Sequence, residues 1–430
     1  MVWQKPREIA ARILLRHAGA RLFVEDAVDQ ELGKTRLSQA DRGLVQELCY
    51  GAVRWQATLD WLIERRTPAR RPPAAALALA RLGLYQLFWL DRVPEHAAVN
   101  ETVEAARTLD FASQTGFLNA LLRGYTREAD ATRTLLTELK TSQPALGWSH
   151  PGWLVDRWQH RLGDAAVQKL LAWNNTPAQT YARINTLRTD AKKTIEVWRT
   201  EGVEYDFGRW DWVPESLVFL LRRHPPLDRL ASFADGWYYI QDPSTLLAVH
   251  LLAPKPGERI LDLCAAPGGK ATLIAQYIDN DGRVIAAEPE ERRRQRLHEN
   301  CQRLGADIEV IGSEYADAMG PYDAILIDAP CSNTGVLRRR IEARWRLTPQ
   351  ELERSTKIQA DLLRSAAPML KPGGRIVYST CSLEPEENRD RVDAFLAEFP
   401  KFQLEASRQL EPSRDSVDGA YAARLVAPAA

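Results

Sequence analysis

The stretch ERILDLCAAPGGK, residues 258–270, decides the fold of the C-terminal half of this 430-residue chain. An apolar run, ERILDL (258–263), predicts a strand, and it leads into a turn with two adjacent glycines and then a helical pattern. Paired glycines let the backbone approach a ligand closely, and the first turn of the next helix offers free N–H groups. Taken alone, such a turn is more often a packing feature than a binding site.

Four more strand-like runs follow, and helical stretches separate them. The runs are RVIAAE (283–288), IEVIG (308–312), YDAILID (322–328) and GRIVYST (374–380), and the helical stretches include 290–305 and 349–370. This alternation predicts a mostly parallel sheet with helices on both faces. Ligands of such sheets bind beyond the carboxyl ends of the strands, so we expect the functional site at that edge.

Two further domains are predicted before this pattern. Residues 1–140 carry apolar residues at three- and four-residue spacing, which predicts an all-helical domain. A segment rich in turn-forming residues, 141–152, marks its end. Residues 141–235 predict a small α+β module, and residues 236–430 form the α/β domain. The segments expected in the module are YARINTLR (181–188) and ESLVFLL (215–221) as strands and DAKKTIEVWRTEG (190–202) as a helix.

Composition limits the function classes without choosing one. Hydrophobic residues make up 45% and charged residues 27%, which is typical of a soluble globular protein. Basic and acidic residues both number 57, so any contact with nucleic acid must come from local patches. The most apolar stretch, 74–90, includes Arg81 and is too short to span a membrane, so we expect a buried helix. Because the N-terminus lacks a signal-peptide pattern, we expect a cytoplasmic protein.

The five cysteines form no CxxC pair, so we expect no structural zinc site and no bound metal. Cys49 and Cys301 lie in helical patterns and are expected to be buried packing residues. Cys331, in DAPCSNTG, and Cys381, in STCS, each follow a predicted strand. A lone cysteine is usually a small buried hydrophobic residue, but two at strand ends that flank one crevice point to chemistry.

Acidic residues end three of the predicted strands, namely Glu288, Glu314 and Asp328. A carboxylate at the end of the second strand of such a fold commonly binds ribose hydroxyls. Each acid alone is as readily a solvated strand end or a helix cap. Together, beside the glycine turn, they favour a cofactor that contains a nucleoside. The turn lacks the glycine and hydroxyl positions of a phosphate-binding loop, which excludes an ATPase.

Three motifs together, LDLCAAPGGK, DAPCSNTG and YSTCSLEPEEN, resemble the signature of RNA 5-methylcytosine methyltransferases. RINTLR and DGWYYIQDPSTLLAVHLL add to this likeness, and LSQADRGLVQELCYGAVRW is similar to the NusB-type RNA-binding helical domain. The combination resembles bacterial small-subunit (16S) rRNA methyltransferases of the Sun or Fmu type over nearly the whole chain. The resemblance implies a monomeric enzyme with a Rossmann-like domain that binds S-adenosyl-L-methionine and acts on 16S rRNA or a small-subunit assembly intermediate.

The resemblance also implies residue roles. C5 of cytosine is a poor nucleophile, and a thiolate that adds to C6 activates it. In the resembling family the Thr-Cys cysteine, here Cys381, attacks C6, and the Pro-Cys cysteine, here Cys331, assists release. Asp328 would hydrogen-bond the cytosine edge and support protonation of N3. The implied cofactor-binding residues are Cys264, Ala265, Ala266, Pro267, Gly268, Gly269, Lys270, Glu288, Glu314 and Asp328.

The chain departs from the family at a few positions. The family usually has Asp where this chain has Glu288 and Glu314, and a His-Pro pair is missing after Cys331. Asp418-Gly419-Ala420-Tyr421 stands where the family shows a Gly-Phe-Phe pattern, and Tyr421 is expected to pack.

RNA contacts are expected from arginines and aromatic side chains. The candidates are Arg338, Arg339 and Arg340 beside the catalytic motif and, with less support, Arg65, Arg66, Arg70 and Arg71. Three alternatives stay open: the same chemistry on tRNA or another rRNA site, a non-catalytic assembly factor, and a DNA cytosine-5 methyltransferase. The intact motifs argue against the assembly factor, and the Thr-Cys motif argues against the DNA enzyme.

Overall fold

The computed structural model describes residues 5–19, 22–68 and 72–429 of the chain. The chain forms two compact units, of which the first comprises residues 1–176 and 340–346 and the second comprises residues 177–339 and 347–430. Within the described ranges, none of the helices has both the length and the apolar character needed to cross a membrane.

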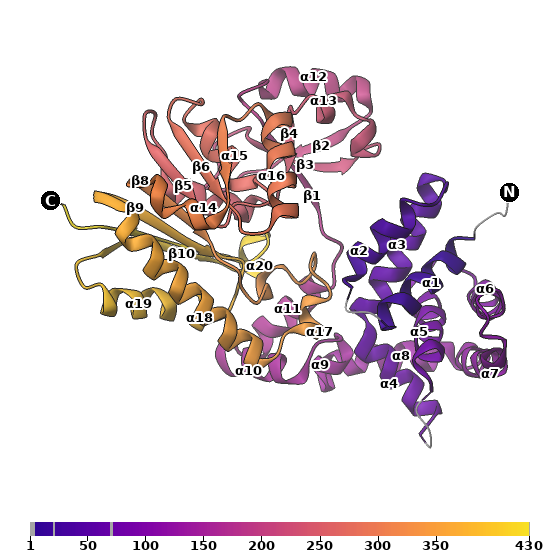
Figure 1. The fold of residues 1–430 in the computed structure, drawn as a ribbon. Helices are drawn as coiled ribbons and strands as arrows, with labels where there is room; N and C mark the ends of the chain where they lie inside the picture. The colour runs from indigo at the N-terminus through magenta and orange to yellow at the C-terminus, as the bar shows by residue number, and fades with distance from the viewer. Residues whose placement is uncertain (1–4, 20–21, 69–71, 430) are drawn as a thin grey trace. The chain divides into compact units, whose positions relative to one another are not determined.

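The first unit is all helical (Figure 1). The apolar spacing predicts helices for residues 1–140, but the unit continues to residue 176 and includes residues 340–346. Its elements are α1 (Pro6–Gly19), α2 (Val24–Leu32), α3 (Gln39–Arg54), α4 (Gln56–Arg66), α5 (Ala74–Trp89), α6 (Glu95–Thr108), η1 (Ala112–Gln114), α7 (Thr115–Thr126), α8 (Ala129–Ser142), α9 (Pro144–Gly147), α10 (Gly152–Leu162), α11 (Asp164–Asn174) and α17 (Ala343–Arg346). Helix α5 packs against α1, α3, α4, α6 and α7. The apolar stretch 74–90 is thus a buried helix, and the turn-rich segment 141–152 contains the short helix α9.

Residues 340–346 join the first unit although the residues on both sides of them belong to the second. Glu342 accepts a hydrogen bond from the backbone N–H of Val24 at 2.5 Å, and the Trp345 indole donates to the Val53 carbonyl at 2.8 Å. Arg344 is fully buried and donates to the carbonyl of Asn174 at 3.0 Å. This segment is therefore folded into the helical unit by specific polar contacts.

A small antiparallel sheet in the second unit has the strand order β2-β3-β1-β4. Its elements are β1 (Thr180–Ile184), α12 (Ala191–Glu201), β2 (Glu204–Phe207), β3 (Val218–Arg223), η2 (Leu227–Arg229), α13 (Ala231–Ala234) and β4 (Tyr238–Ile240). Trp198 of α12 is fully buried against Phe219 and Tyr238. As predicted, α12 ends at Gly202, whose φ of 73° suits glycine. β2 and β4 were not predicted because β2 is largely exposed and β4 is only three residues long.

The second sheet of this unit has seven strands in the order β10-β11-β9-β8-β5-β6-β7. The elements are η3 (Pro243–Thr245), α14 (Leu246–Leu252), β5 (Arg259–Asp262), α15 (Gly269–Tyr277), β6 (Arg283–Ala287), α16 (Glu291–Leu304), β7 (Ile308–Ile311), η4 (Ser313–Tyr315), η5 (Asp317–Met319), β8 (Tyr322–Asp328), η6 (Thr334–Val336), α18 (Pro349–Ala366), η7 (Ala367–Met369), β9 (Leu370–Thr380), η8 (Pro385–Glu387), α19 (Arg389–Glu398), β10 (Gln403–Leu410), α20 (Pro412–Asp415) and β11 (Ala420–Val426). The five predicted strands are β5 to β9, and they pair in parallel. The antiparallel strands β10 and β11 were not predicted.

Alternate residues of the parallel strands bury opposite faces of the sheet. Leu326 of β8 packs with α14 and α15, whereas its neighbours Ile325 and Ile327 pack with Leu363 of α18 and Phe395 of α19. α18 and α19 lie side by side along that second face (Figure 1). Both cores hold the strands in register, so the loops after β5, β6 and β8 emerge together at one edge.

Candidate active site

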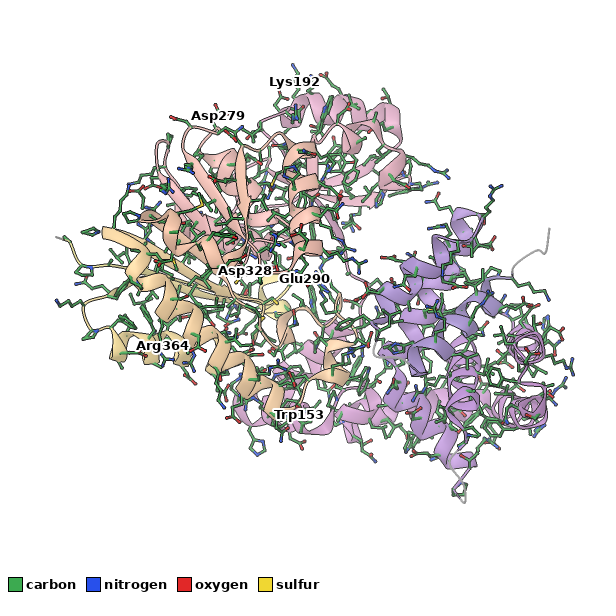
Figure 2. The ribbon with its side chains drawn as sticks, viewed as in Figure 1. Trp153, Lys192, Asp279, Glu290, Asp328 and Arg364 are labelled. Atoms are coloured by element: carbon green, nitrogen blue, oxygen red, sulfur yellow. The ribbon has the colours of Figure 1, made fainter. Side chains whose placement is uncertain are left out.

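The two cysteines that follow β8 and β9 meet at the carboxyl edge of the sheet. β8 and β9 are parallel neighbours in which Asp328 pairs with Ser379, so the chain segments after them begin side by side. The Sγ atoms of Cys331 and Cys381 are 3.2 Å apart, and both residues are partly exposed. Figure 2 shows Asp328 at this edge, while Asp279, which precedes β6, lies toward the opposite edge. The structure thus brings both thiols into one place.

The two thiols have different surroundings. The hydrogen bond with Cys381 and burial raise the pKa of the Cys331 thiol well above its ordinary value, so Cys331 keeps its proton. Cys381 Sγ lies 3.2 Å from Asn333 Oδ1. Asn333 has a left-handed backbone, with φ of 61°, and its side-chain amide donates to the Cys331 carbonyl at 2.9 Å. Asn333 therefore contacts both cysteine-bearing segments.

Asp328 is held by two donors beside the cysteines. Lys270 Nζ donates to Asp328 Oδ2 at 2.6 Å, and Ser379 Oγ donates to Asp328 Oδ1 at 3.0 Å. Burial acts to lower the pKa of Lys270, but the charge of Asp328 holds it above its ordinary value. The Asp328 side chain keeps 36% of its surface exposed, so a fixed carboxylate faces the open side of this edge.

Asp262, at the end of β5, belongs to the same acidic edge, and the strand-end reasoning had omitted it. It is 1% exposed, and among the described residues no side chain donates a hydrogen bond to either of its carboxylate oxygens. Burial raises the pKa of Asp262 to about 7, and the charge of Asp328 adds to this effect. The rule that selected Glu288 and Asp328, an acid at the end of a parallel strand, applies equally to Asp262.

The glycine turn is packed by protein on both sides. Residues 264–267 connect β5 to the turn, and Gly268 has φ of 105°; a Cβ atom there would lie 2.8 Å from Leu297 of α16. Arg183, from the RINTLR motif, is fully buried and donates to the Gly269 carbonyl at 2.5 Å and to Thr272 Oγ1 at 3.0 Å. The close approach of Leu297 thus explains why residue 268 is glycine. The RINTLR motif contributes Arg183, which holds the backbone of the glycine turn.

The two predicted glutamates differ in their setting. Glu288 is 1% exposed, and its Oε1 accepts hydrogen bonds from the backbone N–H of Glu290 and from Arg293, both at 3.2 Å. Glu314 is exposed on η4. In the described part of the chain, no hydrogen bond or ion pair connects Glu314 with Lys270 or Asp328. The buried Glu288 therefore belongs to the site by position, whereas Glu314 lies outside this cluster of contacts.

Comparison with known proteins gives full-length matches. Residues 249–429 match the family described as 16S rRNA methyltransferase RsmB/F, residues 4–127 match the NusB family, and residues 150–220 match the RsmF/B-like ferredoxin-like domain. Ribosomal RNA small subunit methyltransferase B of Salmonella typhi is 35% identical over 408 residues, which are 91% of this chain and 92% of that protein. The chain belongs to the 16S rRNA methyltransferase RsmB/F family.

Two solved structures share the fold of this RsmB/F chain. The crystal structure of PH0851 shares the fold with a TM-score of 0.80 and 24% identity, and the match covers 99% of both chains. A methyltransferase homologue from Pyrococcus horikoshii is 28% identical with a TM-score of 0.58, over 66% of this chain and 97% of that one. The predicted fold class is confirmed: a NusB-type helical domain, a small ferredoxin-like module and a Rossmann-like methyltransferase domain. As an RsmB/F member, the protein is a methyltransferase.

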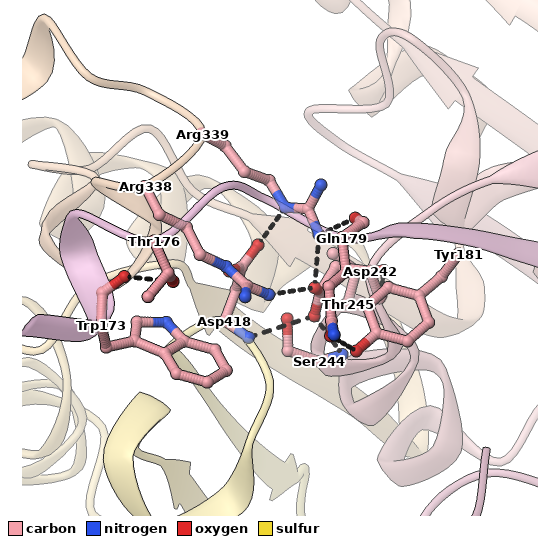
Figure 3. A network of polar contacts seen from close by, with 10 residues as sticks. All are labelled: Trp173, Thr176, Gln179, Tyr181, Asp242, Ser244, Thr245, Arg338, Arg339 and Asp418. Carbon is pink, nitrogen blue, oxygen red and sulfur yellow. Dashed lines mark hydrogen bonds and ion pairs between the residues drawn. The ribbon is translucent and has the colours of Figure 1, made fainter. Parts of the chain in front are cut away.

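Arg338 and Arg339, predicted to contact RNA in this RsmB/F chain, are instead held by two carboxylates (Figure 3). Arg338, 2% exposed at its side chain, donates to Asp418 at 2.6 Å and to Asp242 at 3.3 Å. Arg339 bonds Asp418 and donates to Asp242 at 2.7 Å. The carboxylates that pair with Arg338 and Arg339 lie 79 or more residues away in the sequence, so the run itself does not show them. Both guanidiniums therefore take part in an ion-pair network of the fold, and their contact with RNA stays a prediction.

The remaining candidates divide in the same way. Arg340 is exposed, whereas Arg66 pairs with Glu128 at 2.6 Å. Arg65 stacks over Trp61, and Arg70 and Arg71 lie outside the described residues. Cys49, Cys301 and Tyr421 are buried, as expected of packing residues. No group of side chains with metal-binding character occurs in residues 5–19, 22–68 and 72–429.

Proposed function

We propose that this RsmB/F protein transfers a methyl group from S-adenosyl-L-methionine to C5 of a cytosine in 16S rRNA, through a covalent bond between Cys381 and C6. The observation that carries the proposal is the 3.2 Å contact between the thiols of Cys331 and Cys381 beside the fixed carboxylate of Asp328. One thiol is enough to form a covalent adduct with C6. A second thiol at this distance has a function if it assists the breakdown of that adduct.

The acidic edge fits the proposed cofactor. S-adenosyl-L-methionine supplies an electrophilic methyl group, and it carries an ammonium, a sulfonium and a ribose diol. Asp262 offers a buried carboxylate to which no side chain in the described part of the chain donates, and Glu288 stands where ribose hydroxyls bind in this fold. The turn at 264–270 and the N-terminus of α15 would hold the cofactor's remaining polar groups.

The environments of the two thiols favour Cys381 as the nucleophile. Cys331 keeps its proton, because the hydrogen bond with Cys381 and burial raise its pKa. A thiolate is the reactive form, and in the resembling family the Thr-Cys cysteine is the one that attacks, so we assign the attack on C6 to Cys381. Asp328, oriented by Lys270 and Ser379, would hydrogen-bond the cytosine edge and offset charge that develops in the ring.

The reaction balances as addition, methylation and elimination. The Cys381 thiolate forms a bond to C6, and the C5 carbon that becomes electron-rich takes the methyl group. The methyl–sulfonium bond of the cofactor would break as the methyl group moves to C5, which leaves S-adenosyl-L-homocysteine. Water at this open edge would then take the C5 proton, the C6–S bond would break, and the Cys381 thiolate and the aromatic ring would be restored. Cys331 lies within 3.2 Å of the departing sulfur and is placed to assist this release. The target base must leave its stack to expose the ring face to Cys381.

A 16S rRNA substrate is supported by the family and by the relative from Salmonella typhi, whose name specifies the small-subunit rRNA. Of the three predicted arginines beside the catalytic motif, Arg340 is exposed and remains our candidate contact with RNA. The test is bisulfite sequencing of total RNA from cells with and without the gene, complemented by wild type or Cys381→Ala. We expect one or more 16S cytosines to lose their mark in both the deletion and the Cys381→Ala strain. A mark lost from tRNA instead would identify a different substrate, and no lost mark would refute the proposal.

A further inference from the structure

A cluster of buried hydroxyl groups connects the two cysteine-bearing segments. Each cysteine is followed by a serine, and Ser332 Oγ lies 3.1 Å from Ser382 Oγ. Thr334 Oγ1 completes the cluster at 3.3 Å from Ser332 and 3.2 Å from Ser382. All three side chains are at most 6% exposed. Three buried hydroxyl groups therefore connect segment 330–334 with segment 380–384, directly beside the thiols.

Glu387, in η8, adds a fully buried carboxylate to this cluster. Its Oε1 and Oε2 accept the backbone N–H of Ser332 at 2.9 and 3.2 Å, and Oε2 also accepts the Ser332 hydroxyl. The side-chain amide of Gln359, in α18, donates hydrogen bonds to Glu387 Oε1 at 3.1 Å and to the Pro330 carbonyl at 2.9 Å. Burial raises the pKa of Glu387, and hydrogen bonds from Ser332, Ser382 and Gln359 oppose this rise.

These contacts hold the Cys331 segment and the Cys381 segment by different means. Cys381 follows directly from strand β9, and Asn388 donates to the Ser382 carbonyl at 2.8 Å and accepts the hydroxyl of Thr380 at 2.5 Å. Cys331 lies in a loop after β8. Glu387 accepts a hydrogen bond from the following residue, Ser332, and Gln359 donates one to the preceding residue, Pro330. The Glu387 carboxylate also accepts a hydrogen bond from the Ser382 side chain, but the Cys381 segment is held in addition by β9 and Asn388, whereas Glu387 bonds the backbone of the Cys331 loop directly. Loss of the carboxylate should therefore free the Cys331 loop more than the strand end that carries Cys381.

We propose that Glu387 is a positioning residue for the release step: its carboxylate, acting through Ser332, holds Cys331 within reach of the sulfur of Cys381. The inference rests on the proposed function, in which Cys381 forms the adduct and Cys331 assists its collapse. Glu387 touches neither thiol by a hydrogen bond of its own; it acts on the backbone next to Cys331. Loss of the Glu387 carboxylate should therefore slow the release of Cys381 from the methylated base and leave the attack of Cys381 on C6 intact.

The test compares Glu387→Ala, Glu387→Gln and Ser332→Ala with wild type, Cys331→Ala and the control Asp390→Asn, an exposed carboxylate of α19. Each full-length protein is incubated with S-adenosyl-L-methionine and 16S rRNA. Turnover, KM for RNA, first-turnover methyl transfer and the covalent RNA–protein band on a denaturing gel are measured. For Glu387→Ala we expect turnover to fall by about tenfold or more, a loss of roughly 1.4 kcal/mol, with unchanged KM and an accumulated adduct. Glu387→Gln keeps an acceptor for the Ser332 N–H and should recover most of the turnover.

The outcomes separate this inference from the function beneath it. If Cys331→Ala accumulates adduct but neither Glu387→Ala nor Ser332→Ala does, Glu387 has no role in release and the inference is wrong. Equal losses of first-turnover transfer and turnover, without adduct, would also overturn it. If Glu387→Ala does not fold, as judged by thermal unfolding, the adduct yield of Ser332→Ala and Glu387→Gln decides in the same way. If wild type makes no 5-methylcytosine and Cys331→Ala forms no adduct, the proposed function itself fails.

Discussion

Replacing Asp418 by alanine should destabilise the methyltransferase unit strongly, because the substitution breaks a buried ion-pair network. The Asp418 carboxylate is 1% exposed and bonds the Nε atoms of both Arg338 and Arg339 (Figure 3). Burial acts to raise the pKa of Asp242, but Arg339 and Arg338 hold it below its ordinary value, so Asp242 stays ionised beside them. Without Asp418, two guanidiniums share one carboxylate, and a net positive charge is left in the interior.

The magnitude follows from the burial. Breaking a buried ion pair by removal of one partner costs about 3–5 kcal/mol. For a unit of this size, each kcal/mol shifts the unfolding temperature by about 2–4 °C. Asp418→Ala should therefore lower the Tm of the second unit by roughly 6–20 °C. Asp418→Asn, which keeps the shape and one acceptor, should fall between alanine and wild type.

The same substitution should reduce turnover. Gly419 N–H donates to the Gly335 carbonyl at 2.8 Å, and Gly335 N–H donates to the Cys381 carbonyl at 2.9 Å. A Cβ at Gly335 would lie 2.6 Å from the Gly419 carbonyl oxygen, so the two backbones are in close contact. Displacement of Asp418 would thus be passed to Cys381 through two backbone hydrogen bonds.

The assay is scanning calorimetry of the full-length protein, with the transition of the second unit identified by its upward shift with S-adenosyl-L-methionine. Glu398→Ala is the control, because it removes the exposed ion pair between Glu398 and Arg364 and should leave Tm unchanged. A Tm for Asp418→Ala within about 2 °C of wild type, with full turnover, would show that the network neither stabilises the unit nor positions the catalytic segments.

Three further predictions concern the site itself. Cys381→Ala should abolish methylation without changing Tm; near wild-type methylation of 16S rRNA by this variant would remove Cys381 as the nucleophile. Cys331→Ala should accumulate a denaturant-resistant RNA–protein band, and if it turns over normally without that band, Cys331 is only structural. Asp262 has a pKa raised to about 7, so in the cofactor-free protein its stabilising effect is full below its unfolded pKa of about 4 and is lost as pH rises through about 7. Between these pH values the Tm of Asp262→Asn should therefore fall less than the Tm of wild type, and parallel Tm curves in calorimetry would contradict this expectation. Because S-adenosyl-L-methionine is cationic, it should bind wild type more tightly as pH rises through about 7.

Local patterns sufficed for the parts of this molecule that depend on neighbours in sequence. The five parallel strands are short apolar runs between helices, and each follows from its own composition and spacing. Cys331 and Cys381 could be expected together because parallel strands end at one edge. Asp262 obeys the same rule as Glu288 and Asp328, so its omission was an error of application. The antiparallel strands β10, at the sheet edge, and β11, between β10 and β9, were missed because β10 is half exposed and neither strand belongs to the alternation of parallel strands and helices.

Only the tertiary structure decided the fate of the charged groups. Arg338 and Arg339 look like a solvated run until Asp242 and Asp418, each 79 or more residues away, arrive beside them. Glu387 is one of several acidic residues in LEPEEN, and the sequence does not distinguish it from the others. Its hydrogen bonds to Ser332 form only because the segments after β8 and β9 lie together in the fold. A hydrophobic pattern is fixed by the chain's own period, but the pKa and pairing of a charge depend on which distant groups exclude water from it.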